Sequence, residues 1–105
     1  MKFKVYRAAT FEKEFSKLPH IDQDSIEKFE KKLVENPYLG KPLGYIFLRE
    51  MKLGIRRVYY LVYEDFVIVL MVAISDKKTQ QATINAIKQK LEHYYNFVKE
   101  SLRNF

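Results

Sequence analysis

The chain of 105 residues contains no cysteine and no tryptophan, and it has only three glycines and three prolines. Without cysteine there can be no disulfide, no cysteine-ligated zinc or iron–sulfur site and no thiol nucleophile. The two histidines, His20 and His93, lie 73 residues apart with no acidic cluster beside them. We therefore expect no metal and no cofactor, and we interpret both histidines as structural or solvated.

Long hydrophobic segments are also missing. The longest apolar run, residues 66–74, has nine residues, whereas a membrane-spanning helix needs roughly 20. The first residues alternate charged and apolar side chains and do not form the apolar core of a signal peptide. We therefore expect a cytoplasmic protein with no membrane contact.

The chain carries a net positive charge and has enough apolar residues to form one hydrophobic core. Hydrophobic residues make up 48% of the sequence and aromatic residues 15%, which suits a single domain of this length. The formal net charge is +6, and the segment 37–63 holds five basic residues against one acidic residue. This clustering indicates an anionic partner, which composition alone does not identify.

The N-terminal third predicts a strand followed by two helices. Alternation over residues 2–6 places Phe3 and Val5 on one face of a short strand. Thr10 is the expected cap of a first helix, which ends before Pro19, and a second helix ends before Pro37. The apolar residues of the two helices recur at steps of three and four: Phe11, Phe15 and Leu18, then Ile26, Phe29 and Leu33. The two helices are expected to form an antiparallel hairpin.

After a loop over residues 37–47, the rest of the chain predicts three strands and a helix. The strands are 47–52, 55–63 and 66–75, with a tight turn at Glu64 and Asp65. A period of two places Arg57 and Tyr59 on one face of the sheet and Arg56 and Tyr60 on the other. The last helix is expected to start near Thr79 and to run for roughly 40 Å. Residues 94–105 would then form an extension, which packs on the first two helices or contacts a partner or a second copy.

The predicted fold class is α+β. The first strand and a three-stranded antiparallel meander form a four-stranded sheet, and a helical hairpin and a long C-terminal helix accompany it. We expect the helices on one side of the sheet and a partly open, basic face on the other.

The order of these elements resembles a known family. The segment LREMKLGIRRVYYLVYEDFVIVLMVAISDKKTQQATINAIKQKL, together with the upstream strand, FEKEFSKLP, second helix and Asn-Pro loop, looks like the RelE/ParE/HigB superfamily of toxins from toxin–antitoxin pairs. The resemblance covers roughly residues 1–93. It implies a single RelE-like domain and, as in the RelE and HigB members, cleavage of mRNA at the ribosome.

The resemblance also implies site residues. Arg57 corresponds to the strand arginine that stabilises the transition state, Lys52 to a basic residue proposed as the base, and Lys77 to a basic residue that contacts the phosphate or assists the leaving group. A planar guanidinium suits two phosphate oxygens at once. Arg49, Lys78 and Tyr60 are the further candidates for RNA binding.

This sequence departs from the family pattern at two positions. Thr83 stands where RelE-type members usually have a tyrosine, and Glu50 replaces one lysine of a closely spaced pair. A carboxylate near Lys52 would favour the charged lysine and weaken it as a base. Tyr94, Tyr95 or Tyr60 could replace the missing aromatic residue. The alternative function is a ParE-like inhibitor of gyrase, or a catalytically degenerate toxin, that acts by protein binding.

Each of these possible toxin functions implies an antitoxin. The expected partner is acidic, partly disordered and folded on the basic face of the toxin. The other expected partners are mRNA and the ribosome, and a homodimer through the C-terminal helix is a further prediction.

Overall fold

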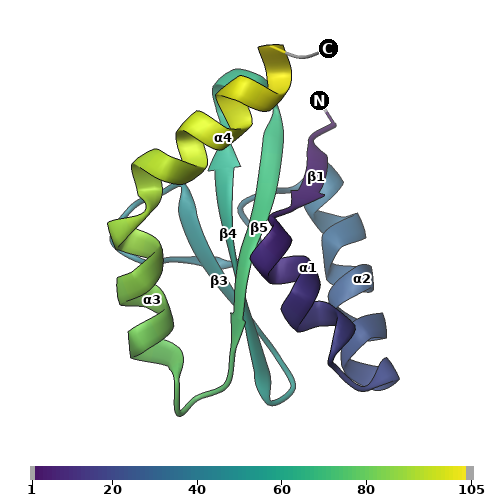
Figure 1. Ribbon diagram of the computed structural model, residues 1–105. Helices are drawn as coiled ribbons and strands as arrows, with labels where there is room; N and C mark the ends of the chain where they lie inside the picture. Colours follow the sequence, from purple (N-terminus) through teal and green to yellow (C-terminus); the bar gives the residue numbers. More distant parts are fainter. Residues whose placement is uncertain (1, 104–105) are drawn as a thin grey trace.

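The computed structural model describes residues 2–103, in which short strands and helices alternate (Figure 1). Their order is β1 (Lys4–Arg7), α1 (Ala9–Ser16), α2 (His20–Glu35), β2 (Lys41–Pro42), β3 (Leu48–Leu53), β4 (Arg56–Tyr63), a 3₁₀ turn (Glu64–Phe66), β5 (Ile68–Ser75), α3 (Gln80–Gln89) and α4 (Leu91–Arg103). Phe105, which belongs to the predicted C-terminal apolar stripe, lies outside the described residues. Within residues 2–103, no helix combines the length and the apolar composition needed to cross a membrane.

The strands form one mixed sheet over the described residues, in the order β1-β5-β4-β3-β2. The meander β3-β4-β5 is antiparallel, as predicted, whereas β1 joins the far edge parallel to β5. The predicted four strands become five, because Lys41 and Pro42 pair with Glu50 and Arg49 as the short strand β2. Two residues, one of them a proline, give no periodic pattern by which such a strand could be predicted.

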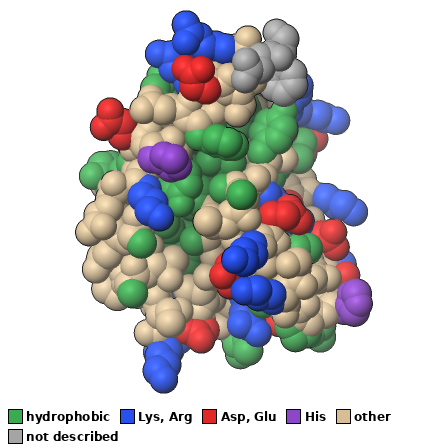
Figure 2. All heavy atoms as spheres, in the orientation of Figure 1, with side chains coloured by type: hydrophobic (Ala, Val, Ile, Leu, Met, Phe, Trp, Pro, Cys, Tyr) green, Lys and Arg blue, Asp and Glu red, His purple; other side chains and the backbone are tan. Residues whose placement is uncertain are grey.

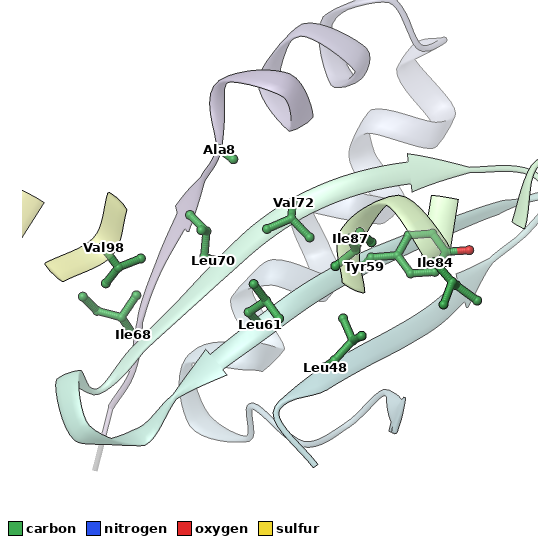
Figure 3. Close-up of a cluster of buried hydrophobic side chains, with 10 residues drawn as sticks. All are labelled: Ala8, Leu48, Tyr59, Leu61, Ile68, Leu70, Val72, Ile84, Ile87 and Val98. Atoms are coloured by element: carbon green, nitrogen blue, oxygen red, sulfur yellow. The ribbon is translucent and has the colours of Figure 1, made fainter. Parts of the chain in front are cut away.

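Helices cover both faces of the sheet, so the prediction that they lie on one side is wrong. The pair α1 and α2 packs against one face, where Phe11, Phe29 and Leu33 meet Val58, Tyr60 and Met71. Helices α3 and α4 cover the other face, where Ile84, Ile87 and Val98 meet Tyr59, Leu61 and Ile68 (Figure 3). The apolar run along β5 fits this arrangement, since a strand buried on both faces needs apolar residues at every position.

The C-terminal helix is broken at Lys90 into α3 and α4, which run in different directions (Figure 1). A straight helix over residues 80–103 would extend roughly 35 Å at 1.5 Å per residue, as long as the longest dimension of the protein, 35 Å. The break keeps both segments on the twisted sheet. Val98 is buried against the sheet, so α4 does not fold back on α1 and α2 as one alternative predicted.

The first helix starts earlier than its predicted cap. Ala8 occupies the N-cap position and makes no side-chain cap. The hydroxyl of Thr10 instead donates to the backbone oxygen of Val72 at 3.3 Å, which ties α1 to β5. Pro19 separates α1 from α2 as predicted, and α2 ends at Glu35.

Candidate functional site

The candidate site lies on the α3 side of the sheet, at the end where β3 and β4 meet in a turn and β5 leads into α3 (Figure 1). Lys52, Arg57 and Ser75 are direct neighbours across β3, β4 and β5. Because antiparallel partners share a face, Lys52 and Arg57 lie side by side, with Cβ atoms about 5 Å apart. Lys52 is exposed and Arg57 is half-buried.

A second row of polar residues lies next to this one. Lys41, Glu50 and Tyr59 are direct neighbours across β2, β3 and β4. The Tyr59 hydroxyl and the Ser75 hydroxyl share a hydrogen bond of 2.8 Å, which links the two rows. Burial is the main cause that raises the pKa of Tyr59, to about 12, so this hydroxyl is protonated at neutral pH.

Glu50 lies at the base of the site, below its exposed surface. The side chain of Glu50 is only 5% exposed. The Gln80 amide at the start of α3 donates to Glu50 Oε2 at 2.8 Å, and Lys41 Nζ lies 3.7 Å from Glu50 Oε1. The ion pair of this carboxylate is therefore with Lys41, and the hydrogen bond fastens α3 to β3. Neither Lys41 nor Gln80 was predicted from the sequence, because only the folded sheet brings them to Glu50.

Lys77 and Lys78 lie in the exposed connection between β5 and α3, at the same end of the sheet. The side chain of Asp76 closes the turn that leads into α3, because its Oδ1 accepts hydrogen bonds from the Thr79 amide at 2.9 Å and from the Thr79 hydroxyl at 3.0 Å. These bonds lower the pKa of Asp76. The two lysines therefore bring positive charge to the end of the sheet that carries Arg57.

Arg49 and Tyr60, both predicted to bind RNA, lie on the opposite, α2 side of the sheet. The guanidinium of Arg49 donates to the backbone oxygens of Tyr38, Gly40 and Ile46, each at 3.0 Å. Arg49 therefore holds the loop between α2 and β3, and it lies on the opposite face of the sheet from Arg57.

Tyr60 is fully buried, with 0% exposure, and its hydroxyl accepts a hydrogen bond of 2.9 Å from the Gly40 amide. It cannot stack on a base, so the RNA-binding role predicted for it is wrong. Together with Arg49, it fixes the backbone next to Lys41.

Thr83 uses its hydroxyl hydrogen within α3. Its hydroxyl donates to the backbone oxygen of Thr79, one turn earlier in α3, at 2.9 Å. Among residues 2–103, no group of three or more histidine, aspartate or glutamate side chains is placed to hold a metal ion.

No protein-family model matches the sequence, and no curated protein sequence matches it. Solved structures do match the fold. The free toxin RelE of E. coli, in a double-mutant form, superposes with a TM-score of 0.73 at 20% sequence identity, over 85% of this chain and 98% of that one. The fold is that of the RelE toxins.

Two toxin–antitoxin complexes show the same RelE fold. The RelBE2 complex of Mycobacterium tuberculosis matches with a TM-score of 0.65 at 20% identity, covering 73% of this chain and 100% of that one. The archaeal RelE–RelB complex from Pyrococcus horikoshii matches with a TM-score of 0.64 at 20% identity, covering 73% and 97%. The RelE-like fold implied by the sequence resemblance is thereby confirmed.

Proposed function

We propose that this protein is the toxin of a toxin–antitoxin pair and that it cleaves mRNA at the ribosome, in the cytoplasm. The observation that carries the proposal is the cross-strand pair of Lys52 and Arg57, placed on one face at the same end of the sheet as Lys77. Three cations that are far apart in the sequence are thus gathered on a RelE fold. An anionic, phosphate-rich substrate suits this arrangement.

The proposed reaction is attack of a ribose 2′-hydroxyl on its own phosphate. The bond from the 2′-oxygen to phosphorus forms and the bond from phosphorus to the 5′-oxygen breaks, leaving a 2′,3′-cyclic phosphate and a 5′-hydroxyl. Arg57 would contact two oxygens of the crowded phosphorane-like transition state. Lys52 would accept the 2′-hydroxyl proton, and Lys77 would donate a proton to the leaving 5′-oxygen.

The surroundings of Glu50 support a role for Lys52 despite the carboxylate two positions away. Because Glu50 pairs with Lys41 and accepts a hydrogen bond from Gln80, its charge is compensated below the surface. Thr83 has no ring to stack on a base, and we assign no aromatic residue to this task.

The antitoxin is the second part of the proposal. Toxin RelE is bound by its antitoxin in the RelBE and RelE–RelB complexes named above, and this chain offers an apolar groove that an antitoxin could fill. The groove consists of two hollows beside α4 that share Phe97: one is also lined by Tyr6 and Leu102, and the other by Ala8 and Tyr94. Figure 2 shows apolar side chains on this face of the molecule. Lys90 lies beside it, and Phe97 is 50% exposed. An amphipathic segment fits such a surface, with its apolar side in the groove and an acidic side chain near Lys90. We therefore place the antitoxin beside α4 and not on the basic face that we expected from the sequence.

Binding of an antitoxin is tested by inspecting the reading frame next to this gene for a short acidic protein and producing that protein together with this one. We expect it to form a complex with the wild-type protein, to suppress its toxicity and to lose affinity at least tenfold for Phe97→Asp. Ile21→Asp, which changes an exposed residue of α2, is the matched control. Equal binding of both variants would place the antitoxin elsewhere, and a symmetric dimer of the isolated protein that Phe97→Asp dissociates would assign the groove to a second copy.

Cleavage is tested with purified protein, free mRNA and mRNA bound to ribosomes. We expect cuts in the ribosome-bound mRNA whose 5′ fragments end in a 2′,3′-cyclic phosphate, together with growth arrest on expression without antitoxin. Intact RNA and normal growth at high expression would contradict the proposal. Inhibition of DNA supercoiling with intact RNA would favour the ParE-like alternative.

A further inference from the structure

Lys41 is a cation of the site that neither the resemblance nor the motifs predicted. It lies in β2 directly opposite Glu50, so its side chain leaves the sheet on the same face as Lys52 and Arg57. Its side chain is 70% exposed, and its ammonium group lies 3.7 Å from Glu50 Oε1. The ammonium group of Lys41 thus has Glu50 on its protein side and remains open to solvent on the other.

Glu50 gives Lys41 a fixed partner. A carboxylate with 5% exposure is costly to bury unless its oxygens are paired, and Glu50 has one partner for each: the Gln80 amide for Oε2 and Lys41 for Oε1. A surface lysine is ordinarily mobile and contributes little through an exposed pair. Here the buried partner restricts where the ammonium can lie.

The backbone of Lys41 is fixed as well, from the other face of the sheet. Gly40, the preceding residue, donates its amide hydrogen to the buried Tyr60 hydroxyl, and its carbonyl oxygen accepts from Arg49. A Cβ atom at Gly40 would lie 2.6 Å from the Glu50 backbone oxygen, which shows how closely β2 approaches β3 here. The lysine is therefore held at both its backbone and its ammonium group.

We propose that Lys41 binds an RNA phosphate next to the one held at Arg57, and that Glu50 is the positioning residue for Lys41. Lys41 on β2 lies two strands away from Arg57 on β4, so their Cβ atoms are roughly 10–12 Å apart. The ammonium group of Lys41 approaches Glu50 on the strand between them, which brings its charge closer to Arg57 and within reach of a neighbouring phosphate on the same RNA strand. This inference rests on the proposed function, because it requires one RNA strand to contact both Lys41 and Arg57.

Binding of a non-cleavable RNA tests the phosphate contact. The probe is a short fluorescent single strand whose 2′-hydroxyls are methylated, titrated with wild-type protein at several salt concentrations. For Lys41→Ala we expect weaker binding, by several-fold at low salt, and a slope of log K against log salt that is smaller by about 0.7. Lys28→Ala, at an exposed position of α2, is the matched control, and we expect it to bind like the wild type. Thermal unfolding checks that each variant is folded.

The positioning role of Glu50 is tested by combining Lys41→Ala with Glu50→Gln. Glutamine can still accept the hydrogen bond from Gln80 but offers no charge to Lys41. If Glu50 positions Lys41, the loss of affinity caused by Lys41→Ala is smaller in the Glu50→Gln background. Equal losses in the two backgrounds would overturn the positioning role.

The outcomes separate this inference from the proposed function. If wild-type protein binds the RNA and Lys41→Ala behaves like Lys28→Ala, the phosphate contact is refuted while cleavage at Arg57 stands. If wild-type protein neither binds the RNA nor cleaves mRNA, both proposals fail together.

Discussion

Tyr60 and Gly40 make a buried hydrogen bond whose removal should have a measurable cost. In Tyr60→Phe the ring remains, with its edge contact to Phe29 at 5.8 Å between centroids, but the Gly40 amide loses the oxygen 2.9 Å away. A buried donor without a partner costs about 1–3 kcal/mol. Because each kcal/mol shifts the unfolding midpoint of a domain of this size by about 4–8 °C, we expect a drop of at least about 4 °C.

Tyr63 offers the matched comparison in the same strand. Among the described residues its hydroxyl is buried without a hydrogen-bond partner, so Tyr63→Phe removes a polar atom that gains nothing in the folded state. We expect its free energy of unfolding to stay the same or to rise by up to about 1 kcal/mol. Urea unfolding followed by circular dichroism measures both variants. Equal losses, or a larger loss for Tyr63→Phe, would refute the hydrogen-bond account of this strand.

Two further predictions concern the base of the site. Gly40→Ala should lower the free energy of unfolding by about 1–3 kcal/mol, because its Cβ would lie 2.6 Å from the Glu50 backbone oxygen, and an unchanged urea midpoint would contradict this close approach. Tyr59 has a pKa of about 12 when folded, against about 10 when unfolded. Between pH 10 and 12 the unfolded chain therefore holds fewer protons than the folded one, and stability should fall as the pH rises. Absorbance titration near 295 nm and unfolding at several pH values check this, with a weaker dependence expected for Tyr59→Phe.

Most of the correct predictions came from the period of two along the long strands, by which successive side chains point to opposite faces of the sheet. It correctly placed Arg57 and Tyr59 on one face of β4, and Val58 and Tyr60 on the other. The two-sided burial of the sheet could also have been predicted, because β5 is apolar at seven successive positions, Ile68–Ile74, and a one-sided strand would alternate. A continuous apolar run is therefore better evidence for two covering layers than the number of helices.

Other features follow from tertiary contacts and have no local signal. Lys90 is neither glycine nor proline, yet the helix breaks there because both of its segments pack on one twisted sheet. From the sequence we expected Glu50 to weaken Lys52 as a base, because the two residues are close in the chain. The partners of its carboxylate, Lys41 and Gln80, lie 9 and 30 residues away and come together only in the folded sheet.

In the proposed function Arg57 acts on RNA from the α3 side of the sheet, and its neighbour Arg56 supplies the most direct test. Arg56 points to the α2 side, where its Nε lies 3.4 Å from Asp22 Oδ2. In a cleavage assay with ribosome-bound mRNA, we expect Arg57→Ala to lower the rate by at least a hundredfold and Arg56→Ala to retain cleavage close to the wild-type rate, with both variants folded. Equal activity of the two variants, or loss of activity only in Arg56→Ala, would contradict the account.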